Sequence, residues 1–439
     1  MNSTLLSWGR YPRYPQTGHG VQWPDEIPDA LACVAALNLG RALPYGKGRS
    51  YGDSCLAESG QVLAMAGMDR TIAADWTTGL ITAQAGLTLD ALIRIALTRG
   101  WFLPVSPGTK FVTLGGAVAN DVHGKNHHVM GTFAQHVRRL SLFRSEDGVV
   151  ECSAEINAPL FNATVGGLGL TGVIRSVELQ LRPVRSGRIQ QRSIKFGNLD
   201  EFFALSAELD PHHEYAVAWV DCLAKGARMG RGHYIVGDHA VDGDLRVTSG
   251  KARTMPVDPP FSLINGVSLR AFNSLYYQRQ QAREVRSVVG YDPFFYPLDK
   301  LLQWNRIYGK AGFQQYQCVV PHAQARDAIG ALLSEIARSG TGSFLAVLKR
   351  CGEIVSPGLM SFPLPGVSLA LDFAQHDAAN ARLFASLDAI VHEAGGRLYP
   401  AKDAHMSAAH FQQAYPAWLQ VEALRDPSLM SRFWQRVTT

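Results

Sequence analysis

The chain has 439 residues, and this length favours two domains over one. Hydrophobic residues make up 46% and charged residues only 18%, which excludes an intrinsically disordered protein because such chains combine low hydrophobicity with high charge. The net charge of +5 is too small to indicate nucleic-acid binding.

The positive charge is unevenly distributed along the chain. Between Lys225 and Arg286 there are ten Lys and Arg against five Asp and Glu, so this segment accounts for the whole excess. Such a segment suits an anionic substrate or an anionic membrane surface, although an ordinary solvated loop region explains it equally well. No apolar run is long enough to span a membrane, so we expect any membrane contact to be peripheral.

The first half of the chain alternates strand-like and helix-like segments. Short strands are predicted at Arg41–Tyr45 and Leu80–Ala85. Apolar residues at helical spacing predict a helix from Leu89 to Leu97, with Thr88 as its N-cap and Gly100 just past its end. Val173–Leu181 alternates apolar and polar residues, which predicts a strand, and Pro183 should end it.

The character of the sequence changes after Pro183. Tyr215–Cys222 and Tyr316–Val320 are predicted strands, and Ala323–Arg338 is a predicted amphipathic helix. Gly250–Phe261 is rich in Pro, Gly and charge and is expected to be a mobile loop. The last forty residues favour helices whose packing residues include Tyr415, Trp418, Leu424 and Phe433.

Two glycine patterns suggest different kinds of loop. Gly167, Gly169 and Gly172 match a dinucleotide-binding fingerprint, but that fingerprint must open a helix and here a strand follows, so we reject it. In Gly46–Asp53, bare backbone could approach a phosphate and form an anion-binding nest. A purely structural turn explains the same residues, and both interpretations remain open at this point.

The segment from Pro107 to His128 is rich in small residues and ends with three histidines. Small residues allow the backbone to lie against a large flat cofactor. The histidines at 123, 127 and 128 could instead form a metal cluster, but no HExxH pattern or neighbouring carboxylate set supports one, so we expect no metal.

Taken together, several motifs resemble one known group of enzymes. They are GRSYGD at 48–53, DVHGKNHH at 121–128, GGLGLTGVI at 166–174, QYQ at 315–317, FPLPG at 362–366 and GRLYPAKD at 396–403. In this order they are similar to the FAD-binding oxidoreductases of the vanillyl-alcohol-oxidase (PCMH-type) superfamily. Within that superfamily they resemble the branch that oxidises a polyprenylphosphoryl-ribose.

This resemblance implies an α+β fold with a two-part FAD-binding domain. The parts would be residues 1–184 and 396–439, and a substrate domain at 185–395, built on an antiparallel sheet covered by helices, would be inserted between them. The cofactor-binding residues implied by the resemblance are Gly46, Lys47, Gly48, Arg49, Ser50, Tyr51, Gly52, Pro107, Gly108, Thr109, Gly115, Gly116, Ala117, Asn120, Asp121, His123, Gly124, Asn126, Gly167, Gly169, Gly172, Val173 and Lys402. Many members bind FAD covalently through a His where this chain has Arg49, so we expect non-covalent FAD.

The resemblance also implies the residues of the active site. Lys402, His123 and Tyr51 would be catalytic, and Gln317, Lys349, Tyr399, Gln315 and Ser368 would bind substrate. Lys402 and His123 are the best candidates for proton transfer because His titrates near neutrality and burial lowers the pKa of Lys. Gln315 and Gln317 are expected on opposite faces of a strand, so that only one reaches substrate. Ala370 stands where mycobacterial members carry a reactive cysteine.

The implied reaction is oxidation of the 2′-hydroxyl of a polyprenylphosphoryl-β-D-ribose to a ketone, the first half of an epimerisation to an arabinose donor for the cell envelope. The implied partners are this lipid-linked sugar and a short-chain keto-reductase that acts next, with no nucleic acid. The implied location is cytoplasmic, in peripheral contact with the inner membrane. Alternatives are a soluble alditol or aldonolactone oxidase on the same scaffold, and a flavin- or lipid-carrier-binding protein without turnover.

Overall fold

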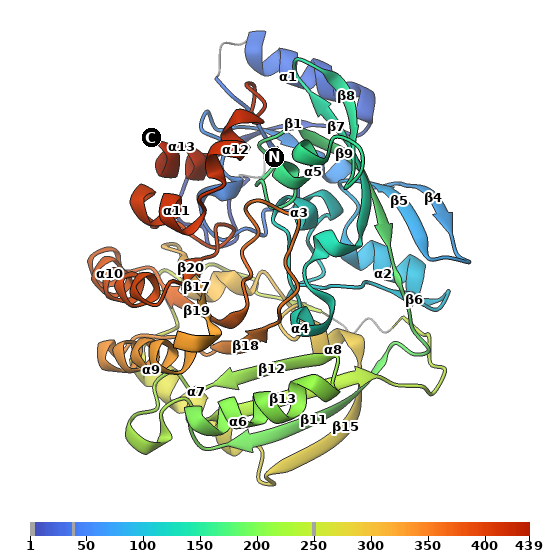
Figure 1. Cartoon of the computed structure of the whole chain (residues 1–439). Coiled ribbons are helices and arrows are strands. Elements are labelled where there is room, and N and C mark those ends of the chain that lie inside the picture. Colours follow the sequence, from blue (N-terminus) through green and yellow to red (C-terminus); the bar gives the residue numbers. More distant parts are fainter. Residues whose placement is uncertain (1–4, 37–39, 248–251) are drawn as a thin grey trace.

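The protein is of the α+β class, with largely antiparallel sheets and helices packed against them (Figure 1). The computed structural model describes residues 5–36, 40–247 and 252–439. Its two largest sheets occupy different halves of the molecule, the five-stranded one above and the eight-stranded one below in Figure 1.

The five-stranded sheet comes from the first half of the chain and is antiparallel throughout. In spatial order its strands are β4 (Thr71–Asp75), β5 (Leu80–Gln84), β9 (Val173–Gln180), β7 (Val137–Arg144) and β8 (Gly148–Cys152). A parallel three-stranded sheet lies beside it, formed by β1 (Thr17–Gly20), β3 (Gln61–Ala64) and β2 (Leu43–Tyr45).

Local sequence explains these elements. In β9 the buried Val177 and Leu179 alternate with half-buried polar residues, which is the pattern of a strand with one face in the core. Helix α2 (Leu89–Leu97) begins where the Thr88 hydroxyl accepts a hydrogen bond from the backbone N–H of Ala91 at 3.2 Å, and Gly100 follows its end with a φ of 81°. These predictions are confirmed.

The eight-stranded sheet is also antiparallel throughout. In spatial order its strands are β15 (Glu284–Gly290), β11 (Arg188–Phe196), β13 (Gly232–His239), β12 (Tyr215–Val220), β18 (Val347–Cys351), β19 (Gly366–Ala374), β17 (Phe313–Pro321) and β20 (Arg397–Leu398). The predicted strands at Tyr215–Cys222 and Tyr316–Val320 are β12 and β17.

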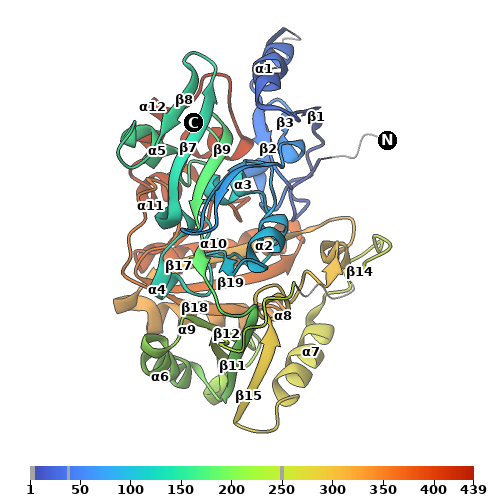
Figure 2. The same ribbon diagram turned by 90° about the vertical axis from the view of Figure 1, so that its right-hand side faces the viewer.

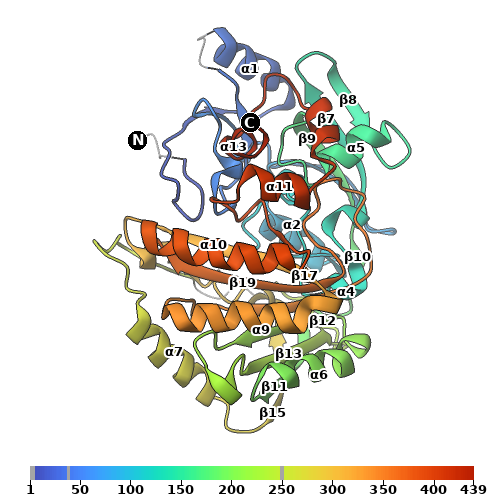
Figure 3. The ribbon, with the colours of Figure 1, turned by 60° about the vertical axis from the view of Figure 1, so that its left-hand side comes forward.

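Helices cover this sheet. Helices α9 (His322–Ser339) and α10 (Asp377–Glu393) run side by side over β17 and β19, and α6 (Leu199–Leu209) packs beside α9 (Figure 3). Helix α7 (Gly266–Gln278) lies on the opposite side of β11 and β12 from α6 (Figure 2). Helix α9 is the amphipathic helix predicted at Ala323–Arg338, and its buried side includes Ile329, Leu332 and Ile336.

The remaining elements are short and connect these layers. They are α1 (Ile27–Ala36), α3 (Leu114–Ala119), α4 (His127–Met130), α5 (Ala158–Thr164), α8 (Tyr291–Phe295), α11 (Ala408–Ala414), α12 (Trp418–Ala423), α13 (Arg432–Thr438), the pair β6 (Trp101–Phe102) and β10 (Arg182–Pro183), and the pair β14 (Arg253–Thr254) and β16 (Leu301–Leu302).

The C-terminal segment returns to the N-terminal half of the chain. The backbone N–H of Ala42 donates to Ser428 at 2.9 Å, and that of Arg432 donates to Leu56 at 2.8 Å. Phe433 and Tyr415 are fully buried, whereas Trp418 and Leu424 pack half-buried against the core. The C-terminal segment therefore packs against the N-terminal half of the chain near residues 42 and 56.

Two predictions need adjustment. Strand β9 already ends at Gln180, and Pro183 belongs to β10, where its missing N–H is tolerated at the end of a two-residue strand. The expected mobile loop Gly250–Phe261 lies partly outside the described residues. From Ala252 onward it is tied down, because Arg253 pairs with Leu301 in a short parallel bridge and Arg10 forms a two-bonded ion pair with Asp258.

Candidate active site

A cavity of about 460 Å³ extends between the loops of the N-terminal half and the eight-stranded sheet. One wall consists of residues 46–51, 106–109, 112, 113, 115, 116, 119, 120 and 122–125, and the other of residues from strands β12, β17, β18 and β19. Residues 399, 401 and 402 complete it from the C-terminal segment. Segments distant in sequence thus converge on one space.

The glycine-rich wall has the character of a cofactor cradle. Gly108 borders the cavity, and a Cβ built there meets no atom within 4 Å, so bare backbone faces the open space. Gly169 adopts a φ of 78°, which glycine tolerates best, and its Cβ would meet only Pro44 at 3.9 Å. Arg49 Nε and Ser54 Oγ are buried at this wall without a hydrogen-bond partner among the described residues. These features fit a large polar cofactor.

Most residues expected at the cofactor line the cavity. They are Gly46, Lys47, Gly48, Arg49, Ser50, Tyr51, Pro107, Gly108, Thr109, Gly115, Gly116, Asn120, His123, Gly124, Gly169, Gly172 and Lys402. All five residues expected at the substrate also line it: Gln315, Gln317, Lys349, Ser368 and Tyr399.

The other expected cofactor residues lie behind the cavity wall: Gly52, Ala117, Asp121, Asn126, Gly167 and Val173. Ala117 and Val173 belong to the apolar core. The Asp121 carboxylate accepts hydrogen bonds from Ser356 Oγ at 2.6 Å and from the Ala134 N–H at 3.0 Å, and Asn126 donates to the Pro104 carbonyl at 2.8 Å. A Cβ on Gly52 would lie 1.6 Å from the Asp403 carbonyl oxygen. In this structure these residues shape the wall rather than border the cavity.

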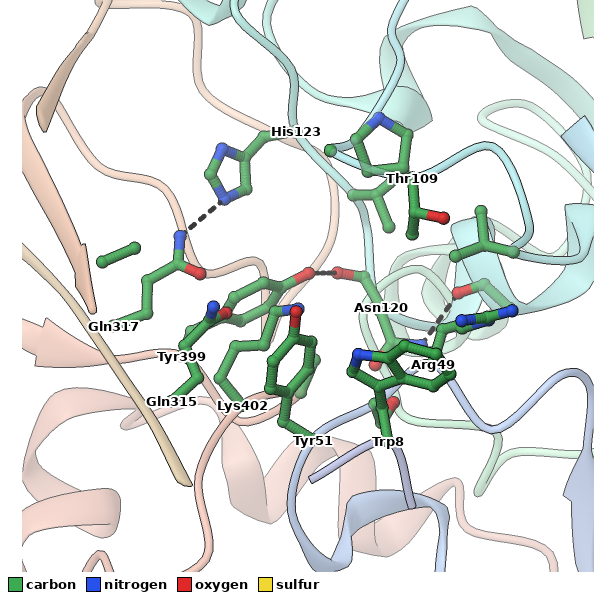
Figure 4. Close-up of a pocket in the computed structure, with 18 of the residues that line it drawn as sticks. Trp8, Arg49, Tyr51, Thr109, Asn120, His123, Gln315, Gln317, Tyr399 and Lys402 are labelled. Carbon is green, nitrogen blue, oxygen red and sulfur yellow. Dashed lines mark hydrogen bonds between the residues drawn. The ribbon is translucent and has the colours of Figure 1, made fainter. Parts of the chain in front are cut away.

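Arg49, the residue at the position of the family's covalent His, stacks on an aromatic ring. Its guanidinium lies 3.9 Å from the centroid of Trp8 (Figure 4). Burial lowers the pKa of this group, and the nearby Asp299 carboxylate opposes that shift. Trp8 and Asp299 both border the cavity. A guanidinium cannot form the covalent flavin bond, so this wall offers a cation instead.

His123, from the glycine-rich wall, is the centre of a polar group that reaches strands β17 and β18 of the opposite wall. Its Nδ1 contacts Lys349 Nζ, and its Nε2 hydrogen-bonds the side-chain amide of Gln317 at 3.2 Å (Figure 4). Lys349 Nζ also donates to the Gly124 carbonyl at 2.7 Å. Burial and the Lys349 charge hold the pKa of His123 well below its ordinary value, so the ring is neutral at physiological pH.

Lys402 has an environment that shifts its titration toward neutrality. Burial lowers its pKa to about 7, and the Asp372 carboxylate opposes that fall. Its Nζ lies 3.7 Å from the centroid of the Tyr51 ring. Burial likewise raises the pKa of Asp372 to about 7, and Gln315 Nε2 donates to this carboxylate at 2.7 Å. A lysine that titrates near pH 7 can gain or lose a proton at Nζ during a reaction.

Backbone hydrogen bonds hold the Lys402 turn against the other walls. The N–H of Lys402 donates to the Tyr399 carbonyl, and the N–H of Tyr51 donates to Ala401, both at 2.9 Å. Tyr399 Oη donates to the Asn120 carbonyl at 2.8 Å (Figure 4). Three separate segments therefore fix the position of this lysine.

The expectation that Gln315 and Gln317 face opposite ways is wrong. Residues two apart on a strand share a face, and both side chains border the cavity. Tyr316 between them points to the opposite side, where its hydroxyl donates to Asp388 at 3.0 Å in the core.

Some cavity residues were missed from sequence. Asp372 alternates with Ser368 and Ala370 on β19, and all three line the cavity, so the period of two was the signal that could have found it. Lys125 also lines the cavity; its Nζ donates to the Phe294 carbonyl, and burial lowers its pKa to about 7. Trp8 and Asp299 lie far from every motif, and no local pattern marks them.

The glycine cradle, together with a family comparison, defines the class of protein. The sequence profile described as "FAD binding domain" matches residues 21–153. This match assigns an FAD-binding domain to the protein.

Comparison with characterised proteins narrows the class. The chain is 34% identical over 437 residues to the decaprenylphosphoryl-beta-D-ribose oxidase of Mycolicibacterium smegmatis, covering 96% of this chain and 94% of that protein. It is 34% identical to an uncharacterised protein of Streptomyces coelicolor, covering 78% of this chain and 96% of that protein. It is 31% identical to the L-gulonolactone oxidase of Mus musculus, but over only 36% of this chain and 35% of that enzyme. The chain therefore belongs to the family of FAD-binding oxidoreductases that includes decaprenylphosphoryl-β-D-ribose oxidase.

Proposed function

We propose that the protein oxidises the 2′-hydroxyl of a polyprenylphosphoryl-β-D-ribose to a 2′-ketone. The observation that carries this proposal is one cavity that combines a glycine-rich wall, a polar group around His123 and Lys402, and an apolar end. That apolar end is formed by Val217, Trp219, Ile235, Tyr276, Leu345 and Val347. A sugar linked to a lipid carrier needs a polar surface for the sugar and an apolar surface for the lipid. The similarity along nearly the whole chain to a decaprenylphosphoryl-ribose oxidase supports this substrate class.

The proposed domain organisation follows the same reasoning. Residues 1–184 and 396–439 would form the FAD-binding domain, and 185–395 an inserted substrate domain. The backbone contacts of Ala42 with Ser428 and of Leu56 with Arg432 support the first grouping. Seven of the eight strands in the large sheet come from 185–395, and β20 contributes the eighth from beyond the insertion.

Bound FAD supplies the acceptor for the hydride that leaves the carbinol carbon. Gln315 and Gln317, on one face of β17, would hold sugar hydroxyls by hydrogen bonds. Lys402 would exchange a proton at Nζ, and in its charged form would stabilise negative charge in the site. His123, kept neutral by burial and by the Lys349 charge, would orient the Gln317 amide at the substrate through its Nε2.

Anaerobic reduction of the flavin tests the proposal. We expect loss of the flavin's visible absorbance on addition of a polyprenylphosphoryl ribose, and no loss with xylitol or a sugar lactone. The partial similarity to L-gulonolactone oxidase favours one rival, a soluble alditol or aldonolactone oxidase, and reduction by a lactone or alditol would support it. A flavin that no alcohol reduces would indicate a binding protein. The 2′-ketone would be the substrate of a separate short-chain reductase.

A further inference from the structure

The outer side of helix α7 exposes a row of apolar side chains. Val267, Ala271 and Leu275 are spaced by four residues and therefore share one side of the helix. Val267 is 76% exposed and Leu275 is 70% exposed. Phe261, Leu263 and Phe272 are also exposed, at 69%, 43% and 42%. We call Val267, Ala271 and Leu275 the apolar face of α7.

The inner side of α7 is firmly anchored, so the apolar face does not result from a loosely placed helix. Leu269 and Asn273 are buried, and Asn273 Nδ2 donates to Asp221 Oδ1 at 3.2 Å. Tyr277 Oη donates to the Phe196 carbonyl at 3.2 Å. The Asn265 side chain caps the first turn by accepting from Val267 and Ser268. Rotating the helix to bury Val267 and Leu275 would break these bonds.

The segment that carries this face contains charges of one sign. Residues 259–283 contain Arg270, Arg279 and Arg283 and no Asp or Glu. Arg270 and Arg279 are exposed, and neither has an acidic partner within ion-pair distance in the described parts of the chain. Exposed aliphatic and aromatic groups flanked by arginines match the headgroup region of an anionic bilayer, where apolar groups enter the acyl boundary and cations meet lipid phosphates. An acidic protein partner would leave the apolar row less well explained.

The same helix also borders the cavity. Tyr276 lines its apolar end, and its ring centroid lies 4.5 Å from that of Trp219. Figure 2 shows α7 at the outer edge of the molecule, away from α6. The apolar face and the apolar end of the cavity are thus opposite sides of one helix. No helix within residues 5–36, 40–247 and 252–439 is long and apolar enough to cross a membrane.

We infer that the apolar face of α7 docks on an anionic lipid surface and brings the apolar end of the cavity to that surface. A lipid-linked substrate would then pass from the bilayer to the active site without crossing water. The delivery of a lipid-linked substrate rests on the proposed function, but docking on the lipid surface can be measured without turnover.

Vesicle flotation tests the inference on the FAD-loaded protein. The probes are vesicles of phosphatidylcholine alone and of phosphatidylcholine with phosphatidylglycerol in equal molar amounts. We expect binding to the anionic vesicles that weakens with added salt, because the arginine contribution is screened. In the variant Val267→Glu/Leu275→Glu the partition coefficient should fall at least about tenfold, since two apolar groups no longer enter the lipid. The matched control is Ile72→Glu/Leu419→Glu, which changes residues that are 57% and 61% exposed on other elements, and it should bind like the wild type.

Each outcome of the flotation experiment supports or overturns the inferred docking. Failure of the wild type to float with anionic vesicles, or equal binding by both double variants, would overturn the inference. Sedimentation velocity is run in parallel: self-association that Val267→Glu/Leu275→Glu abolishes, without vesicle binding, would assign the face to a second copy of the chain. Flavin reduction by detergent-solubilised substrate should be the same in wild type and Val267→Glu/Leu275→Glu. If Val267→Glu/Leu275→Glu no longer floats with vesicles but its flavin is still reduced, docking is separated from the proposed function. If the flavin is reduced in neither protein, only the proposed function is refuted.

Discussion

Arg436, from the last helix, joins the two loops that carry Tyr51 and Lys402, and its removal should loosen both. Its Nε and Nη2 donate to the two carboxylate oxygens of Asp53 at 3.0 and 2.9 Å, and Nη2 also donates to Asp403 at 2.8 Å. The carboxylates of Asp53 and Asp403 are nearly inaccessible, with side-chain exposures of 6% and 1%. Arg436→Met would leave both without their shared cation.

The expected loss in the free energy of unfolding is about 3–5 kcal/mol, the usual cost of removing one partner from a buried ion pair. His405 remains near Asp403, so part of that carboxylate's stabilisation persists. FAD should also bind more weakly, because the loop 46–53 and the Lys402 turn are no longer held together. Denaturant unfolding measures the first effect, and fluorescence titration of the apoprotein with FAD measures the second.

The pH dependence of the variant gives a further check. Burial already raises the pKa of Asp53 in the folded state with Arg436 in place, and loss of this cation, which opposes that rise, should raise it further. The folded state then binds more protons, so the stability deficit should shrink as the pH falls toward the acidic range. Arg246→Met is the control, since Arg246 is 84% exposed in its pair with Asp244 and its removal should leave the stability nearly unchanged. Wild-type stability and FAD affinity in Arg436→Met would refute the reasoning.

Three more predictions follow from the cavity. Burial lowers the pKa of Lys402 to about 7, below its unfolded value, so the charged lysine destabilises the folded state at neutral pH. Lys402→Met should therefore raise the thermal midpoint of the apoprotein at pH 7, and this gain in stability should vanish toward pH 10–11. Anaerobic flavin reduction should be lost in the same variant. Gln315→Ala and Gln317→Ala should each slow flavin reduction by roughly tenfold, because both side chains border the cavity and each can lose a hydrogen bond to substrate; FAD content, read from the absorbance spectrum, should not change. Ala370→Cys should make residue 370 reactive toward a thiol-directed reagent, which peptide mass mapping would detect. Cys55 also borders the cavity, but it should stay unlabelled because burial raises its pKa to about 12.

Controls distinguish these outcomes from general damage. Tyr316→Phe changes the opposite face of β17 and removes the hydrogen bond to Asp388, so it should lower stability by about 1 kcal/mol and leave flavin reduction intact. Normal reduction by Lys402→Met would remove this lysine from the mechanism. A Gln315→Ala variant as active as wild type would show that only one glutamine contacts substrate. Labelling of Cys55 before residue 370 would contradict the pKa argument.

Sequence alone determined the elements and the cofactor. The period of two in Val173–Leu181 and the capped helix at Leu89–Leu97 depend on near neighbours in the chain, and the structure confirms both. The Gly-rich segments alone left a phosphate-binding loop and a structural turn open, and FAD was implied only by the resemblance that the motifs carry together. The same local rule, correctly applied, would also have placed Gln315 and Gln317 on one face.

Only the tertiary structure decided which groups act on one another. The low pKa of His123 and the near-neutral pKa of Lys402 arise from burial in a cavity lined by segments distant in sequence, together with the charges of Lys349 and Asp372. The link from Arg436 to Asp53 spans 383 residues. Desolvation and charge–charge distance depend on how the chain closes around the cavity, and no spacing along the sequence encodes them.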